Sequence, residues 1–78
     1  MLEQALKALR AAQRASRDQT IVKYVLEARG LVEAGLASPK MAAQERKAVE
    51  QLQHALVPVL EVINDHAQLK LRVSAALD

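Results

Sequence analysis

Histidine, serine and carboxylate side chains are the groups in this 78-residue chain that could carry out acid–base or nucleophilic chemistry. The two histidines, His54 and His66, are twelve residues apart, and neither has a second histidine one helical turn away to form a zinc pair. Glu50 lies four residues before His54 and would add only a single ligand. We therefore predict no metal site and interpret both histidines as surface residues.

Asp65 and His66, taken with a serine, contain the residue types of a hydrolytic triad. The candidate serines are Ser16, Ser38 and Ser74. A triad also needs a sharp turn that presents the nucleophile, donors for an oxyanion and a pocket for the substrate. The sequence has no pattern for these parts and no glycine-rich phosphate loop. We expect no enzymatic activity, no cofactor and no small-molecule substrate.

The composition favours an all-α protein. Hydrophobic residues make up 51% of the chain and aromatic residues only 1%, so the apolar content is mainly Ala, Leu and Val. This composition is typical of helices that pack closely on other helices. The chain has no cysteine, which excludes disulfide bonds and thiolate metal sites. It forms at most one small domain.

Charge and hydropathy limit the kinds of partner. The chain has 11 basic and 9 acidic residues, a net charge of +2, so bulk charge does not drive binding. No apolar run approaches the roughly 20 residues needed to span a bilayer. The start, Met-Leu-Glu-Gln, lacks the basic-then-apolar order of a signal peptide. We expect a cytoplasmic protein without membrane insertion.

An amphipathic helix is predicted over residues 2–15, where Leu2, Leu6 and Leu9 recur at spacings of four and three. Its opposite side carries a basic stripe, which consists of Lys7, Arg10, Arg14 and Arg17. Three interpretations of this stripe are open. It is a solvated helix face, a docking face for an acidic protein, or a contact for nucleic acid or a membrane surface, although no aromatic residue accompanies it.

A second helix is predicted over residues 17–34. Ser16 and Gln19 have the spacing of a capping box, and the apolar stripe shifts by one residue between the two segments. A break is therefore favoured over one continuous helix from 2 to 34. Gly30 lies inside this helix, where it costs about 1 kcal/mol relative to Ala. This cost is more readily tolerated if another backbone approaches closely there.

A hairpin turn is predicted at residues 35–38. Gly35 can adopt the left-handed conformation that ends a helix in a Schellman motif. Ser38 and Pro39 suit the N-cap and the first position of the next helix. A helix end and a helix start this close together make the two helices antiparallel.

The next helix is predicted over residues 39–64. Pro58 removes one backbone hydrogen bond, so we expect a kink or a new helix start there. The mixed charges of residues 45–50 indicate a solvated helix face. Residues 66–77 form a further helix or a frayed tail, because a lone strand would have nothing to pair with.

The hairpin helices have a wide apolar face. It is formed by Ile21, Val25, Val32, Val49, Leu52, Leu56, Val59 and Ile63. Either residues 2–15 and 66–77 fold back to close a small bundle, or part of the face stays open. We expect an open face whose eight apolar residues bind a partner, because so small a core without aromatic residues should be marginally stable alone. The predicted fold is all-α: an antiparallel helical hairpin with an additional N-terminal helix, in a small bundle or an oligomeric assembly.

The hairpin also resembles a known family. The matching residues are the run Glu27-Ala28-Arg29-Gly30-Leu31-Val32-Glu33-Ala34-Gly35, a short link to Pro39, and a return helix with Ala48, Val49 and Leu52. Over about residues 20–64 this pattern resembles the small YscE-like co-chaperones of type III secretion systems. The resemblance implies a cytoplasmic helical hairpin that binds a helical-repeat chaperone, and the pair keeps a needle subunit soluble. It implies no catalytic residue.

These patterns lead to one main functional prediction and two alternatives. The main prediction is a non-enzymatic protein–protein interaction module, with a type III secretion co-chaperone as its most specific form. Its partner is another helical protein or a second copy of the chain. The alternatives are a homo-oligomeric helical bundle that binds nucleic acid through the basic stripe, and a small inhibitor protein encoded by a mobile element.

Overall fold

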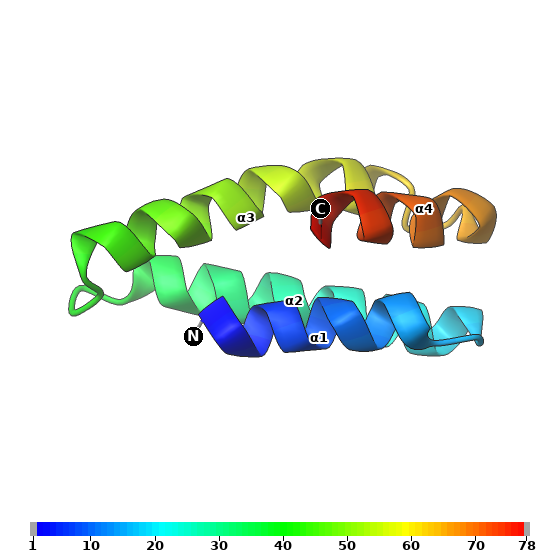
Figure 1. Cartoon of the computed structure of the whole chain (residues 1–78), viewed down its shortest axis with the longest axis horizontal. Helices are drawn as coiled ribbons and strands as arrows, with labels where there is room; N and C mark the ends of the chain where they lie inside the picture. Colours follow the sequence, from blue (N-terminus) through cyan, green and yellow to red (C-terminus); the bar gives the residue numbers. More distant parts are fainter. Residues whose placement is uncertain (1, 78) are drawn as a thin grey trace.

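The computed structural model describes residues 2–77, which form four helices joined by short connections (Figure 1). The helices are α1 (Leu2–Arg14), α2 (Asp18–Ala37), α3 (Ala43–Glu61) and α4 (His66–Leu77). No strand is present within residues 2–77. The predicted all-α fold is confirmed.

Each helix runs antiparallel to the one before it, and together they surround one core (Figure 1). α1 packs most extensively on α2, while α4 lies against both α1 and α3 and closes the bundle. The Cα radius of gyration is 12.0 Å, close to the roughly 11.5 Å typical of a folded domain of this length. The closed bundle is therefore the correct alternative, and the expected open hairpin face is not found.

The core is made entirely of apolar residues, since no polar or charged residue among those described is buried. Its fully buried larger side chains are Leu9, Val25, Val32, Val49, Leu56, Val59, Leu69 and Val73. Between α1 and α2 the core consists largely of alanines: Ala5, Ala8, Ala12 and Ala28 are all buried. Because these side chains are short, the two helices can pack at close range.

The break between α1 and α2 falls at residues 15–17, as predicted, but the predicted capping box is wrong. The N-cap position is Arg17, whose side chain makes no capping hydrogen bond, and Ser16 lies one residue too early. α2 begins instead with Asp18 in its first turn. A carboxylate is favourable there because the N-terminal end of a helix carries partial positive charge.

The turn between α2 and α3 spans residues 38–42 rather than 35–38. Gly35 is a buried residue inside α2, and no glycine within the described chain has a positive φ, so the predicted Schellman ending is wrong. The helix continues because Gly35 belongs to its core-facing side, and helix-favouring Ala and Leu residues surround it. α2 ends at Ala37.

The predicted start of the third helix is also wrong. Ser38 is the C-cap of α2, and its hydroxyl accepts a hydrogen bond from the Lys40 backbone N–H at 3.4 Å, within the turn. The N-cap of α3 is Ala42, three residues after Pro39. At its other end α3 continues through Pro58 to Glu61, so no new helix starts at the proline. Pro58 has no N–H to donate to the His54 carbonyl, and the helix continues past this one missing bond for three more residues.

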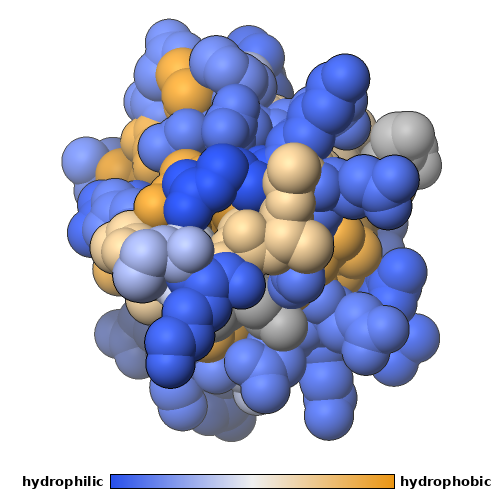
Figure 2. Space-filling view, turned by 90° about the vertical axis from the view of Figure 1, so that its left-hand side faces the viewer, coloured by the Kyte–Doolittle hydropathy of each residue, from blue (hydrophilic) through white to orange (hydrophobic). Residues whose placement is uncertain are grey.

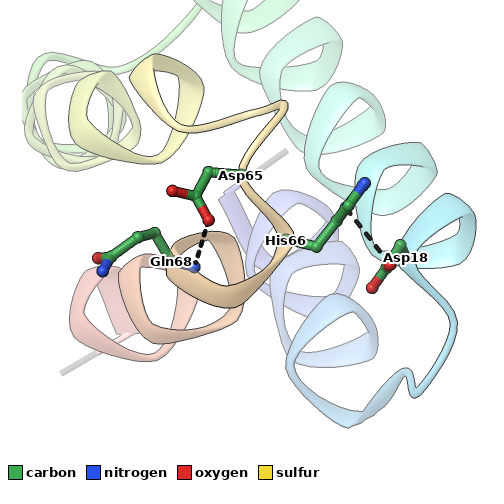
Figure 3. A network of polar contacts seen from close by, with 4 residues as sticks. All are labelled: Asp18, Asp65, His66 and Gln68. Atoms are coloured by element: carbon green, nitrogen blue, oxygen red, sulfur yellow. Dashed lines mark hydrogen bonds and ion pairs between the residues drawn. The ribbon is translucent and has the colours of Figure 1, made fainter.

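The C-terminal segment is a helix, α4, rather than a frayed tail. Asp65 is its N-cap: the Asp65 carboxylate accepts a hydrogen bond from the Gln68 backbone N–H at 3.2 Å (Figure 3). The Asp65 carbonyl accepts the Leu69 N–H at 2.8 Å, which starts the helical bonding. His66 Nδ1 lies 3.7 Å from the Asp18 carboxylate and joins the starts of α4 and α2 (Figure 3). Both side chains are about half exposed, so this contact adds little stability.

Gly30 has an open environment, so no close approach of another backbone accounts for the glycine. It is exposed in the middle of α2, and a Cβ atom placed on it would meet no atom within 4 Å. Nothing within the described bundle therefore requires a glycine at this position.

We expect Gly30→Ala to raise the free energy of unfolding by about 0.5–1 kcal/mol, because Ala has the higher helix propensity and stiffens the unfolded chain. Urea denaturation followed by circular dichroism measures the change. Ala34→Gly, at another exposed position of α2, is the matched control and should lower stability by a similar amount. A loss of stability in Gly30→Ala would show that the position is crowded.

Asp65→Ala should lower the free energy of unfolding by about 1 kcal/mol, because the N-terminal N–H groups of α4 lose their side-chain acceptor. Asp65→Asn keeps an acceptor oxygen and should lose less. Both values come from the same denaturation experiment. Equal stability of Asp65→Ala and the unchanged protein would show that the cap does not hold α4.

Candidate interaction surface

The structure places the predicted apolar partner-binding residues inside the bundle. Seven of the eight are buried: Ile21, Val25, Val32, Val49, Leu52, Leu56 and Val59. Ile63, in the turn after α3, is half-buried against the same core. α1 and α4 cover most of the face that these residues form, and Val32 and Leu56 also line a groove at the surface, between α2 and α3.

The predicted basic stripe, in contrast, is exposed. Lys7, Arg10 and Arg14 project from α1, and Arg17 follows in the connection to α2. The ion pairs found within residues 2–77 are Arg29–Glu33 and His66–Asp18, and neither involves the stripe. The charges of the stripe are therefore accessible to another molecule.

α4 lies beside α1 and enlarges the charged surface. The two helices are joined by a hydrogen bond from Gln13 Nε2 to Ser74 Oγ, at 3.2 Å. α4 adds the exposed residues Lys70 and Arg72. Together α1 and α4 carry five basic residues and one acidic residue, Glu3, a net charge of +4.

α2 and α3 have the opposite balance, with four basic and six acidic residues and a net charge of −2. The small net charge of the whole chain thus conceals a polarised molecule. The basic surplus belongs to α1 and α4 and the acidic surplus to α2 and α3, with Asp18 and Glu27 of α2 lying next to α4 and α1. Local charge of this kind steers and orients a partner even when the total charge is small.

Leu71 is an exposed apolar residue on the outer side of α4, with 66% of its surface accessible. Ala67 and Ala75 lie one helical turn away on either side of it, and Lys70 and Arg72 flank it in the sequence. The basic face, as we define it, has Lys7 at its α2 edge and Arg72 at its α3 edge, and consists of Lys7, Arg10, Arg14, Arg17, Lys70, Leu71 and Arg72. It combines positive charge with one apolar contact point.

One groove lies next to the basic face, and a second groove lies on the opposite side of the bundle. One, of about 490 Å³, separates α1 from α2 and is lined by Gln4, Lys7, Ala8, Ala11, Tyr24, Glu27 and Leu31. Another, of about 170 Å³, lies between α2 and α3 and is lined by Arg29, Val32, Glu33, Gln53, Leu56, Val57 and Leu60. The titratable side chains in these linings are Lys7, Tyr24 and Glu27 in the first groove and the Arg29–Glu33 ion pair in the second.

The end of the bundle that carries the α2–α3 turn shows mainly hydrophilic side chains, with hydrophobic ones scattered between them (Figure 2). Leu36 and Met41, near this turn, are half-buried against the core. No wide apolar surface faces the viewer at this end.

Arg46 has a role that the sequence did not indicate. Its Nη1 donates to the Leu36 carbonyl at 2.9 Å and its Nη2 to the Ser38 carbonyl at 2.6 Å. The guanidinium thus closes the C-terminal end of α2, where free carbonyls and the helix dipole favour a cation. Its charged neighbours Glu45 and Lys47 are exposed and fit the predicted solvated face, but Arg46 is half-buried.

The residues with catalytic potential are not brought together. His66 faces Asp18, and Ser74 accepts its hydrogen bond from Gln13. Both histidines are exposed, as predicted. Within residues 2–77 no group of three or more His, Asp or Glu side chains is arranged to hold a metal ion.

Length and hydropathy rule out a membrane crossing for each helix that the structure describes. Comparison with models of protein families, with curated proteins and with solved structures gives no match to this chain.

Arg46→Met should lower the free energy of unfolding by about 1.5–3 kcal/mol, because two carbonyls at the end of α2 lose a charged donor. Urea denaturation measures the loss, and Arg46→Lys, which cannot reach both carbonyls with a planar fork, should recover only part of it. The neighbouring exposed Lys47→Met is the control and should change stability by less than about 0.5 kcal/mol. Equal effects at the two positions would argue against a specific role for Arg46.

Proposed function

We propose that this protein is a non-enzymatic protein–protein interaction module that binds an acidic, amphipathic helix of another protein through its basic face. The observation that supports this most is Leu71, which is 66% exposed between Lys70 and Arg72. An apolar side chain surrounded by positive charge suits a partner that offers both apolar and acidic groups.

The apolar contact favours a protein over nucleic acid as the partner. Covering a leucine side chain completely is worth about 1.5–3 kcal/mol, and a phosphate backbone cannot supply that cover. The basic face also has no aromatic side chain, which single-stranded nucleic acids generally use for base stacking. Positive charge then orients the partner and speeds its approach, while Leu71 provides the anchor.

The dimensions of the face suit a helix of three to four turns. α1 has 13 residues and α4 has 12, so each is about 18–20 Å long at 1.5 Å per residue. Arg10 and Arg14 are four residues apart and lie on the same side of α1. A partner helix with carboxylates at the same spacing and a leucine or isoleucine stripe beside them would match both charges and Leu71.

The most specific form of this proposal is a co-chaperone of type III secretion, which the resemblance of residues 20–64 to the YscE-like family supports. In this form the partner is a helical-repeat chaperone, and the compartment is the cytoplasm. We expect the outer basic face to make the contact, because α1 and α4 already occupy the apolar face of the hairpin.

A second candidate function, binding of nucleic acid, is favoured by the same five basic residues on α1 and α4. Nucleic-acid binding differs from helix binding in its salt dependence and in the contribution of Leu71. Phosphate contacts would make the affinity fall steeply with salt, by a slope of about −0.9 per phosphate contacted on duplex DNA, and Leu71 would contribute little.

Reversing two charges and removing the anchor tests the proposed function. The probe is a synthetic amphipathic helix with glutamates four residues apart and a leucine stripe, followed by fluorescence anisotropy. Arg10→Glu combined with Arg14→Glu should weaken binding by at least about tenfold, and Leu71→Ala by about three- to tenfold. The control reverses two exposed charges on the other side, Lys23→Glu with Lys47→Glu, and should change binding by less than about twofold.

The same variants, titrated with duplex DNA and single-stranded RNA, separate the two candidates. Binding of nucleic acid that is lost in the α1 charge reversal but unchanged in Leu71→Ala would favour the second function. Two results together would refute a role for the basic face. The unchanged protein would fail to bind the acidic helix, and Arg10→Glu with Arg14→Glu would still bind the proteins that co-purify from the native host as strongly as the unchanged protein does.

A further inference from the structure

We infer that a second copy of this chain docks on the basic face, with its α2–α3 groove placed over Leu71. This rests on the proposed function, because it names a partner for the same face. The occupant has to supply an apolar recess and acidic neighbours. The chain carries both on the side of the bundle formed by α2 and α3.

The apolar recess is the groove of about 170 Å³ between α2 and α3. Val57, which is 49% exposed, forms one wall, and the partly or fully buried side chains of Leu56 and Leu60 lie beside it. A recess this small takes a single side chain such as leucine and not a whole helix.

The charges around the two parts are complementary, because the one basic residue of the groove lining, Arg29, is paired with Glu33 at 3.8 Å and the remaining charges beside the groove are acidic. Glu61 lies four residues after Val57 and Glu50 seven residues before it, so helical spacing puts both on the same side of α3, and both are exposed. Lys70 and Arg72 flank Leu71 on α4. When Leu71 enters the groove, its two basic neighbours come to the acidic side of α3 in the second copy. The net charge of +4 on α1 and α4 also attracts the net charge of −2 on α2 and α3 of the second copy, and so supports the same docking.

The contact joins two different surfaces, so it is heterologous. Two basic faces would repel each other, which disfavours a symmetric dimer through Leu71. In this four-helix arrangement the α1–α4 side is opposite the α2–α3 side. Each docked pair therefore keeps one free basic face and one free groove, and further copies can add to form short chains. A single leucine and a few ion pairs make a small interface, so the association is weak and depends on concentration.

Sedimentation velocity over a wide range of protein concentration tests this arrangement. We expect the average mass to rise with concentration and to fall when sodium chloride is raised, because screening weakens the ion pairs. Leu71→Glu removes the anchor, and Val57→Lys blocks the groove and adds a charge that repels Lys70. Each variant should weaken association by at least about tenfold. Both positions are exposed, and circular dichroism checks that the fold is retained.

Mixing the two variants gives the decisive result. Leu71→Glu keeps a native groove and Val57→Lys keeps a native Leu71, so each mixed pair can form one native contact and no more. We expect 1:1 heterodimers that do not grow, from two proteins that are monomeric alone. Gln51→Lys adds the same charge at an exposed position of α3 outside the groove and should associate like the unchanged protein.

Several outcomes would overturn the inference: a monomer at every concentration, association unchanged in Val57→Lys, or no heterodimer on mixing. The acidic helix used above separates this failure from failure of the proposed function. Val57→Lys leaves the basic face intact and should bind that helix with unchanged affinity. If the unchanged protein binds the acidic helix but does not self-associate, only the second copy is refuted as the partner. If it self-associates but does not bind the acidic helix, only the proposed binding of a helix from another protein is refuted.

Discussion

The wide apolar face of the α2–α3 hairpin is the constraint on which the rest of the structure depends. Two antiparallel helices can cover one stripe on each other, but Val25 and Leu56 belong to faces that need neighbours on two sides. α1 supplies Leu9 and a row of small alanines, and α4 supplies Leu69 and Val73. Once these are in place, the apolar positions that could have held a partner are used to hold the fold.

Polar contacts act at the ends and edges of this bundle and not in its interior. Arg46 closes the end of α2, Asp65 starts α4, and Gln13 links α1 to α4 through Ser74. Each satisfies groups that apolar packing leaves free, such as terminal N–H and carbonyl groups of helices. Apolar burial thus holds the helices together, and these few bonds define where the helices begin and end.

The closed core also decides which surface is left for function. With the hairpin face covered, α1 and α4 lie side by side, and both helices expose basic residues beside Leu71 or at the outer edges of the two helices, Lys7 next to α2 and Arg72 next to α3. The acidic surplus lies on α2 and α3. A chain of almost neutral composition thereby gains two unlike sides, which is the physical basis for both the proposed partner helix and the docking of a second copy.

The sequence by itself determined the helical class, the break near residue 16, the hairpin and the apolar face of its two helices, because apolar periodicity and short connections are local properties. It misplaced the helix ends: Gly35 and Ser38 have the chemistry of caps, but Gly35 is held in the core, and Arg46, ten residues from Leu36, closes the helix instead. Only the tertiary structure decided that the core positions face inward and that Lys70 and Leu71 join the stripe of α1. The packing of α4 beside α1 brings together residues far apart in the sequence, such as Gln13 and Ser74, which are 61 positions apart. No local sequence pattern specifies such packing.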